Sequence, residues 1–226
     1  MKNGRENAPA SIGVDAMITV VSRLSLSAFL MAAISTAWLV GAAADSLPRA
    51  SYGSVGAATS VPYGWKDFCQ RERAECLGPV LPALDIKITG AALAKLERVN
   101  RAVNQSIEPV TNLEHWGTMF DHWDYPLDGK GDCKVYALYK RKLLIDMGFP
   151  RQALLMTIVR DLNDEGHTIL TVKTNRGEFV LDNLSDEIRP WDQTGYRFMK
   201  RQSQEDPNVW VALDPAAGQV STSSRD

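Results

Sequence analysis

The chain has 226 residues, of which 45% are hydrophobic and 23% charged, and its 25 basic residues nearly balance 27 acidic ones. This composition is typical of a globular protein of one domain and excludes a wholly disordered chain. A net charge of -2 gives no reason to expect a nucleic acid as partner. The three cysteines, Cys69, Cys76 and Cys133, include no C-x-x-C pair, which excludes the usual cysteine-based zinc sites.

Residues 1–44 have the pattern of a secretory signal peptide. Basic residues, among them Lys2 and Arg23, precede a mostly apolar run from Leu24 to Val40, and small residues follow it up to Ala44. This pattern predicts export to the periplasm, with cleavage after Ala44. The alternative is an uncleaved anchor in the inner membrane that leaves the protein facing the periplasm, because the apolar run is near the short end of what spans a bilayer.

The remaining chain is expected to contain one folded domain. A stretch rich in serine, glycine, alanine and threonine predicts a flexible linker over residues 45–64. The domain is then expected at residues 65–215, followed by a disordered tail at residues 216–226.

The cysteines have different expected roles in an exported protein, where thiols tend to pair. Cys69 and Cys76 lie close enough in sequence for a short loop or two helical turns to join them, so we predict a disulfide between them. The alternative is two buried free thiols. Cys133 is then left as a reactive nucleophile, an intermolecular partner or a small buried hydrophobic residue.

Two helices and a loop are predicted in the first half of the domain. Apolar residues recur at intervals of three and four from Thr89 to Ile107, which predicts an amphipathic helix with Thr89 as its N-cap. Residues 108–131 contain prolines, glycines and aromatic residues without a sustained period, and predict a long ordered loop. A second helix is expected from Asp132 or Cys133 to Met147.

The second half of the domain has a β-type sequence pattern. Strands are predicted at residues 154–159, 167–173 and 178–182, with a turn at residues 175–177, and a last pair at residues 196–199 and 209–213. Helices followed by a run of antiparallel strands indicate an α+β fold in which a helix packs on the sheet.

Three residues fall where nucleophilic catalysis would need them. Cys133 lies at the start of the second helix, where free backbone N–H groups and the helix dipole favour a thiolate. His167 begins one predicted strand and Asp182 lies near the end of the next, so a short turn would bring both to one edge of the sheet. A nucleophile, a base and an orienting carboxylate would then meet, as acyl transfer requires. Each residue also has a plain alternative, since His167 could be an ordinary partly buried histidine and Asp182 a turn residue.

The order of several short motifs resembles the family of bacterial transglutaminase-like cysteine proteinases, whose best-known members are periplasmic LapG-type proteases. The motifs are Val99-Asn100, Val103-Asn104, Asp121-His122-Trp123, Gly131-Asp132-Cys133, Gly166-His167 and Val180-Leu181-Asp182-Asn183. The resemblance covers residues 65–213 and implies a papain- and transglutaminase-like core, with the nucleophile at a helix N-terminus packed on an antiparallel sheet. It implies that Cys133 is the nucleophile, His167 the general base and Asp182 the orienting carboxylate.

One departure from the family concerns calcium. Members usually read Gly-Asp-Cys-Glu-Asp, and in LapG-type enzymes the acidic residues beside the cysteine help to bind a calcium ion needed for activity. Asp132 matches such a ligand here, but Lys134 stands in place of the glutamate, and its ammonium group removes one ligand and repels the ion. Asp121, Asp124 and Asp128 lie nearby in sequence and could form a weaker or rearranged site. Calcium is therefore a possible but doubtful cofactor, and the chemistry itself requires none. Lys134 could instead favour the Cys133 thiolate, or simply be a solvated side chain.

Several aromatic or basic residues outside the triad have alternative interpretations. Trp116 and Trp123 are candidates for lining a substrate groove or donating to an oxyanion, although aromatic residues are more often part of the core. His115 and His122 lack a third ligand at a recognisable spacing and are interpreted as structural. The basic run at residues 140–142 is interpreted as the solvated face of the second helix.

The leading hypothesis is a periplasmic cysteine endopeptidase that acts on exported proteins through a thioester. By resemblance, its substrates would include large surface adhesins, cut to release cells from a biofilm, and an inner-membrane protein would regulate it. The alternatives are acyl transfer to an amine, as in transglutaminases, and a non-catalytic binding module on the same fold. A monomer is expected, because no exposed heptad or repeat demands an oligomer.

Overall fold

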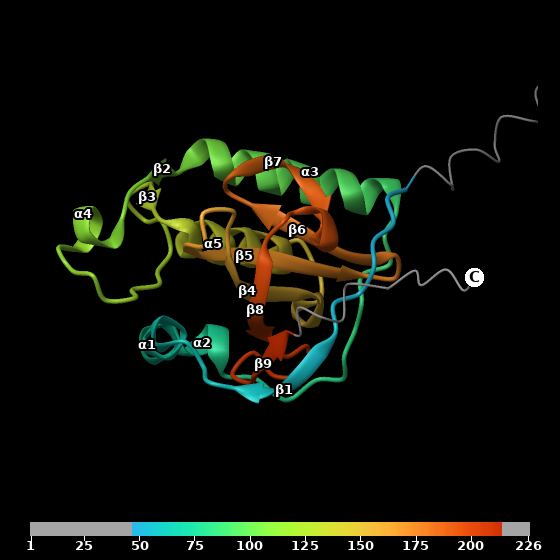
Figure 1. Ribbon diagram of the computed structural model, residues 1–226, viewed down its shortest axis with the longest axis horizontal. Coiled ribbons are helices and arrows are strands. Elements are labelled where there is room, and N and C mark those ends of the chain that lie inside the picture. Colours follow the sequence, from blue (N-terminus) through green and yellow to red (C-terminus); the bar gives the residue numbers. More distant parts are fainter. Residues whose placement is uncertain (1–46, 214–226) are drawn as a thin grey trace, which may run out of the picture. The chain divides into compact units, whose positions relative to one another are not determined.

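The computed structural model describes residues 47–213 (Figure 1). The signal peptide predicted for residues 1–44 and the tail predicted for residues 216–226 lie outside this part of the chain. Between residues 47 and 213, no helix is both long and apolar enough to cross a bilayer.

A seven-stranded antiparallel sheet forms the centre of the domain. Its strands follow the order β1-β9-β8-β4-β5-β6-β7, so β4 to β7 are neighbours both in the chain and in the sheet. The bounds are β1 Val55–Thr59, β4 Leu154–Arg160, β5 Gly166–Thr174, β6 Gly177–Asp182, β7 Ser185–Pro190, β8 Arg197–Gln202 and β9 Trp210–Leu213. The strands predicted from the sequence correspond to β4, β5, β6, β8 and β9.

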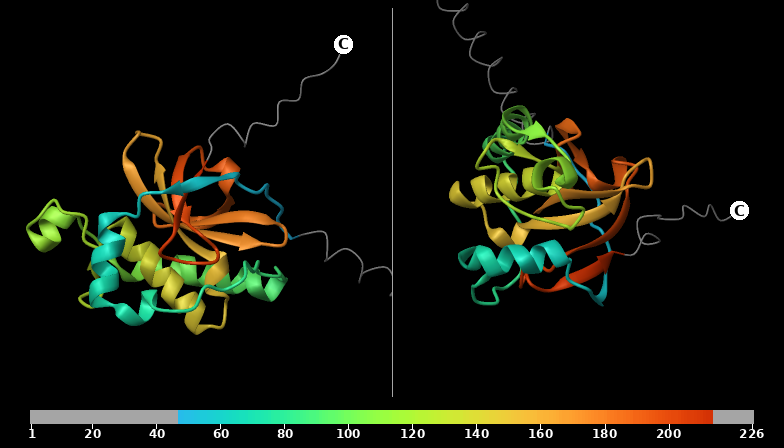
Figure 2. Two further views of the ribbon diagram at one scale, coloured as in Figure 1. Left: turned by 90° about the horizontal axis from the view of Figure 1, so that it is seen from below. Right: turned by 90° about the vertical axis from the view of Figure 1, so that its left-hand side faces the viewer.

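The longer helices cover one face of this sheet (Figure 2, left). α5 packs across β4, β5 and β6, and α3 packs against α5 and β7. The helices are α1 Tyr63–Arg71, α2 Arg73–Cys76, α3 Gly90–Ser106, α4 Asn112–Trp116 and α5 Cys133–Asp146, with short 3-10 turns at Arg151–Ala153 and Trp191–Gln193. The expected α+β arrangement of helices on an antiparallel sheet is thus confirmed.

Side-chain caps fix where the two long helices begin. The Thr89 side chain accepts a 3.1 Å hydrogen bond from Ala92 N, and the Asp132 side chain accepts one of the same length from Lys134 N. Each cap satisfies a backbone N–H group that has no partner within the helix. The predicted N-cap at Thr89 is confirmed, and the second helix begins at Cys133.

Two apolar clusters hold the layers together. In β5, Leu170 and Val172 belong to a large cluster shared with the helices, whereas Ile169 belongs to a smaller one with Val159 and Phe198. Neighbouring residues of a strand point to opposite faces, so the two clusters lie on opposite sides of the sheet. Both faces of β5 are therefore buried, which positions the start of that strand firmly.

The start of the domain differs from the sequence prediction. Val55–Thr59 forms β1 and pairs with β9, and α1 begins at Tyr63, so the expectation of a structureless linker over residues 45–64 is wrong for these segments. All five residues of β1 are exposed. The strand is held by backbone pairing at the edge of the sheet, which side-chain composition does not report.

The predicted loop at residues 108–131 also contains short elements. β2 Glu108–Pro109 pairs in parallel with β3 Lys130–Gly131, and α4 lies between them. A reciprocal pair of hydrogen bonds between Thr111 and Glu114 caps α4. The longest irregular part of this region is thus residues 117–129.

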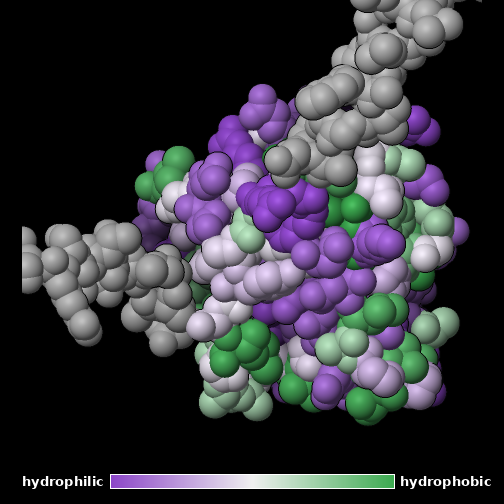
Figure 3. Space-filling model, turned by 90° about the vertical axis from the view of Figure 1, so that its right-hand side faces the viewer, coloured by the Kyte–Doolittle hydropathy of each residue, from purple (hydrophilic) through white to green (hydrophobic). Residues whose placement is uncertain are grey.

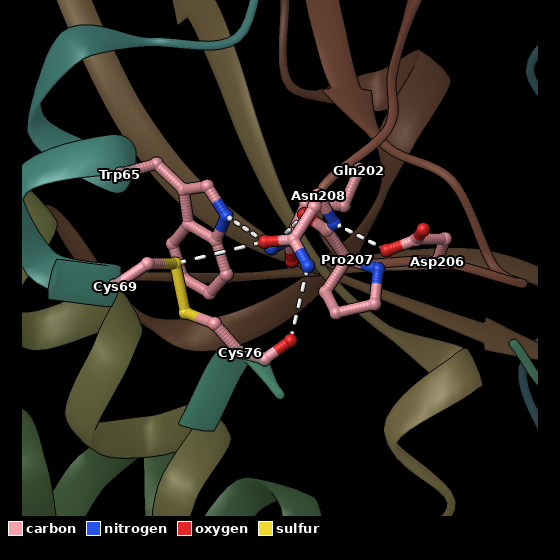
Figure 4. Close-up of a disulfide and its surroundings, with 7 residues drawn as sticks. All are labelled: Trp65, Cys69, Cys76, Gln202, Asp206, Pro207 and Asn208. Atoms are coloured by element: carbon pink, nitrogen blue, oxygen red, sulfur yellow. Dashed lines mark hydrogen bonds between the residues drawn. A yellow bond between two sulfur atoms is a disulfide. The ribbon is translucent and has the colours of Figure 1, made fainter. Parts of the chain in front are cut away.

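A disulfide joins Cys69 of α1 to Cys76 of α2, and one asparagine ties it to the sheet (Figure 4). Asn208, in the connection between β8 and β9, donates from Nδ2 to Cys76 O (3.0 Å) and accepts at Oδ1 from Trp65 Nε1 (3.2 Å). The disulfide therefore closes the α1–α2 turn while Asn208 attaches that turn to the β8–β9 connection.

The face that Figure 3 shows contains the β5–β6 turn, and hydrophilic side chains gather across its middle. The start of β5 and the end of β6 lie at the opposite end of these strands, because the two strands are antiparallel. The predicted catalytic residues therefore lie away from this turn.

Candidate active site

Cys133 is the first residue of α5, and its thiol is free and partly buried. Gly131, two residues before Cys133, packs closely against the first turn of α5. A Cβ atom at residue 131 would lie only 2.5 Å from the Val135 side chain, so a larger residue would not fit there. The Asp132 cap then starts the helix. The first turn of a helix offers backbone N–H groups and a positive dipole end, both of which stabilise an anion.

His167 and Asp182 meet at the edge predicted for them. His167 is the second residue of β5 and Asp182 the last of β6, and their atoms Nε2 and Oδ1 are 2.8 Å apart. Both side chains are buried, with exposed fractions of 7% and 6%. The hairpin between the strands produces this contact, since the Leu170–Leu181 pair sets the start of β5 beside the end of β6.

Two further donors fix the Asp182 carboxylate. Tyr196, just before β8, donates its hydroxyl to Oδ2 (2.6 Å), and Leu184 N donates to Oδ1 (3.1 Å). Burial alone would raise the pKa of Asp182, but the hydrogen bonds from His167, Tyr196 and Leu184 outweigh it, and the pKa is lowered. The carboxylate is therefore ionised and held in one orientation.

His167 contacts both Asp182 and Cys133. Burial, the largest single influence, lowers its pKa, but hydrogen bonds with Asp182 and Cys133 and the charges of both raise the pKa to about 10. Since Nε2 contacts Asp182, the other ring nitrogen, Nδ1, is left for Cys133. The structure thus brings Cys133, His167 and Asp182 together, with a charged imidazole beside the thiol at neutral pH.

Lys134, the residue after Cys133, is neither solvated nor free. Its Nζ atom forms an ion pair with Asp132 Oδ2 and lies 3.6 Å from Asp121 Oδ1. Burial lowers the pKa of Lys134, but the charges of Asp132, Cys133 and Asp121 outweigh it, so the pKa is raised. A fixed ammonium group therefore occupies the space between two carboxylates.

The acidic residues near Cys133 do not fit the calcium ion that the family resemblance implies. Calcium takes six to eight oxygen ligands, whereas the Asp132 carboxylate is engaged by an ammonium group and a backbone N–H group. Within residues 47–213, no group of three or more histidine, cysteine, aspartate or glutamate side chains is arranged to hold a metal ion.

The two tryptophan candidates have different surroundings. Trp123 is fully buried in the main core and donates from Nε1 to Asp121 Oδ1 (2.9 Å), so its proposed role as a substrate or oxyanion residue is wrong. Trp116 is 43% exposed at the end of α4 and remains a candidate for contacting substrate. Its ring lies between those of His115 and His122, at centroid distances of 4.1 and 4.6 Å.

Both histidines of this region have acidic neighbours. His115 Nε2 lies 2.7 Å from Asp128 Oδ2, and His122 Nε2 lies 3.4 Å from Asp124 Oδ2. His122 Nδ1 also lies 3.8 Å from Asp67 Oδ2 of α1. These contacts with acidic side chains agree with the structural interpretation of both histidines.

The basic run at residues 140–142 does not form a solvated face. Lys140 and Arg141 are buried, with exposed fractions of 0% and 2%, and only Lys142 is partly exposed. Arg141 donates from Nε to Leu154 O (3.1 Å), which satisfies part of its guanidinium group. Lys140 has no hydrogen-bond partner among residues 47–213, and burial lowers its pKa to about 7, although the charges of Asp182 and Asp186 oppose this shift.

Sequence reasoning missed Tyr196 and Lys140 as neighbours of the triad. Tyr196 carries no motif, and only the fold brings it to Asp182. Lys140 could have been found, because it follows Tyr136 by four residues and precedes Leu144 by four, and so lies on the buried stripe of α5.

The sequence matches one family model and several solved structures. The model described as bacterial transglutaminase-like cysteine proteinase BTLCP matches residues 55–217. Calcium-bound LapG of Legionella pneumophila is 25% identical over 56% of this chain and 71% of its own, with a TM-score of 0.47. A second LapG structure from that organism is 26% identical over 58% of this chain and 75% of its own, with a TM-score of 0.46. An EGTA-treated form is 25% identical over 56% of this chain and 69% of its own, with a TM-score of 0.45. A search of curated proteins gives no match.

Proposed function

The chain belongs to the family of bacterial transglutaminase-like cysteine proteinases and is a cysteine peptidase, and on that premise we propose that it cuts exported proteins through a thioester formed on Cys133. His167 is the proton carrier and Asp182 the orienting carboxylate. The observation that carries the proposal is the buried 2.8 Å contact between His167 and Asp182 beside a free thiol at a helix N-terminus.

The first half of the proposed reaction forms the acyl-enzyme. The Cys133 thiolate attacks the carbonyl carbon of the scissile peptide bond, and the charged His167 gives its proton to the leaving nitrogen. The carbon–nitrogen bond breaks, which releases the C-terminal fragment as an amine. A thioester on Cys133 and a neutral His167 remain.

The second half hydrolyses the thioester. Neutral His167 takes a proton from a water molecule, whose oxygen attacks the thioester carbonyl carbon. The carbon–sulfur bond breaks, the N-terminal fragment leaves as a carboxylic acid, and the thiolate and imidazolium are restored. Asp182 keeps Nδ1 of His167 directed at the sulfur throughout, while Tyr196 and Leu184 hold Asp182.

We further propose that this chemistry takes place in the periplasm. The signal-peptide pattern up to Ala44 supports export. The Cys69–Cys76 disulfide supports it independently, since disulfides persist in oxidising compartments. By family resemblance, the substrates include large surface adhesins and the enzyme responds to an inner-membrane regulatory protein.

The test compares the wild type with Cys133→Ala on surface proteins from cells that lack the gene. We expect new peptide termini with the wild type and a loss of at least about 10³-fold in their rate of formation with the variant. Equal melting temperatures would show that the variant is folded. Unchanged cleavage by Cys133→Ala would contradict the assignment of the nucleophile.

A fluorescent primary amine in the same reaction distinguishes hydrolysis from acyl transfer. We expect two cleaved fragments and no labelled product, because the proposed second step uses water. Covalent incorporation of the amine in place of cleavage would favour a transglutaminase-type reaction instead.

A further inference from the structure

The residue that follows the nucleophile contributes a positive charge fixed by two carboxylates. Lys134 Nζ forms an ion pair with Asp132 and lies 3.6 Å from Asp121 Oδ1, and the Lys134 side chain is only 14% exposed. By comparison, Lys142 on the same helix is 38% exposed, and its closest acidic atom is 3.4 Å away. Lys134 is thus a built-in part of the site, not a mobile surface lysine.

The two carboxylates connect Lys134 to three segments. Asp132 caps α5 by accepting from Lys134 N (3.1 Å). Asp121 belongs to the segment at residues 117–129, accepts from Gly64 N at the start of α1 (3.2 Å) and also accepts from Trp123 Nε1 (2.9 Å). The ammonium group therefore joins the start of α5 to the 117–129 segment and, through Asp121, to α1.

This charge compensates an otherwise anionic arrangement. Asp132 and Asp121 each carry a negative charge. The proposed mechanism adds a third negative charge, the thiolate of Cys133, which lies between Asp132 and Lys134 in the sequence. Like charges so close repel one another unless a cation lies among them. A divalent ion could supply that cation, but here the Lys134 ammonium group already does so.

We propose that Lys134 is a positioning residue whose ammonium group holds Asp132, Asp121 and the start of α5 in place, so that this enzyme needs no calcium ion. The proposal rests on the proposed function only in taking Cys133 as the nucleophile. It gives this chain a property different from the calcium dependence that the family resemblance implies.

The experiment measures the alkylation rate of Cys133 by iodoacetamide at pH 7 with EGTA or with about 1 mM calcium, a concentration in the range that extracellular calcium sites respond to. The wild type should react at the same rate in both. Lys134→Gln should react about tenfold more slowly in both, because it lacks the cation beside the thiolate. Lys134→Arg should keep most of the rate, since it retains the charge.

Lys134→Glu restores the acidic residue usual in the family. We expect it to react slowly in EGTA and to recover with calcium, and calorimetry should detect calcium binding to this variant but not to the wild type. Lys142→Gln is the matched control and should behave as the wild type. These readouts differ from a general loss of folding, which calcium would not reverse and which melting temperatures would reveal in each variant.

Two outcomes would overturn the proposal. One is a wild-type rate that falls in EGTA and returns with calcium, and the other is a Lys134→Gln rate equal to that of the wild type. Failure of the proposed function would be distinct: wild-type alkylation would then be as slow as that of an ordinary thiol and unaffected by His167→Ala, whatever the calcium concentration.

Discussion

Two buried basic groups lie near Asp182, one from the sheet and one from the helix layer, and their proton affinities shift in opposite directions. His167 of β5 contacts Asp182 Oδ1 at 2.8 Å, and its pKa rises to about 10. Lys140 of α5 has no hydrogen-bond partner among the described residues, and its pKa falls to about 7. The surroundings of His167, on the sheet side of Asp182, therefore favour its charged form. The surroundings of Lys140, on the helix side, disfavour its charged form.

The contrast shows what decides charge at this depth in the protein. Burial lowers the pKa of both groups, and the charge of Asp182 raises both. Only His167 has hydrogen bonds with Asp182 and Cys133 in addition. Direct pairing therefore determines which group carries the proton at neutral pH, and proximity to a carboxylate alone is not sufficient.

The largest expected effect comes from removing the charge of Asp182. Asp182→Asn should lower kcat/KM by about 10³- to 10⁴-fold, because the imidazolium loses its partner and the ring its fixed tautomer. The pKa of His167 should fall at the same time, which NMR titration of the imidazole would detect. The pKa of Lys140 should fall further, since Asp182 is the first charge that supports its protonated form.

Asp186→Asn is the matched control for this variant. Asp186 also raises the pKa of Lys140, but its carboxylate accepts from Asn104 Nδ2 (3.0 Å) and does not contact His167. We expect it to leave kcat/KM within about threefold of the wild type. Equal losses of kcat/KM in the two variants would mean that the reaction depends on negative charge near α5, and not on the contact between Asp182 and His167.

Lys140→Met tests the lowered pKa of Lys140 through the pH dependence of the free energy of unfolding. The pKa of Lys140 is lowered from 10.5 to about 7, so the unfolded chain binds more protons from about pH 7 to 10.5 and this residue makes stability rise with pH. The pKa of His167 is raised from 6.5 to about 10. Its contribution is therefore complete below pH 6.5 and is lost as pH rises towards 10. The two groups thus oppose each other over nearly the same range.

Without Lys140, the contribution of His167 should dominate the pH dependence. Urea unfolding should show Lys140→Met to be more stable than the wild type by about 1–3 kcal/mol at pH 6, because a buried group without a partner is removed. This advantage should shrink as pH rises towards 10. Lys142→Met, on the same helix but partly exposed, should give no comparable gain in stability at pH 6. An advantage for Lys140→Met that grows with pH would contradict the assigned shift.

Strong local patterns explain which elements could be predicted from the sequence. The strands β4, β5 and β6 are rich in apolar and β-branched residues and are buried on both faces, and Thr89 and Asp132 mark helix starts through their side chains. The exposed strand β1 had no comparable signal, since only its backbone pairs with β9. Elements held by backbone pairing alone are therefore the ones that composition misses.

The active site shows the same division between local and distant information. Cys133 could be placed from a helix start, and the contact of His167 with Asp182 from a short hairpin, because each depends on neighbouring segments. Tyr196 reaches Asp182 from the connection before β8, and Asp121 reaches Lys134 from the 117–129 segment. These contacts depend on how distant segments pack, and no spacing in the sequence reports them.

Tyr196→Phe should lower the activity much less than Asp182→Asn. The variant removes the hydroxyl that donates to Oδ2 (2.6 Å), but leaves the contact with His167 and the donor at Leu184 N. We expect kcat/KM to fall by about tenfold, equivalent to about 1.4 kcal/mol, which is close to the lower end of the range for a hydrogen bond to a charged group. Tyr52→Phe is the matched control, because Tyr52 donates to Thr174 O (2.8 Å) at the far end of β5. It should cost stability without changing kcat/KM, whereas a loss in Tyr196→Phe as large as in Asp182→Asn would mean that Tyr196, and not the pairing with His167, fixes the carboxylate.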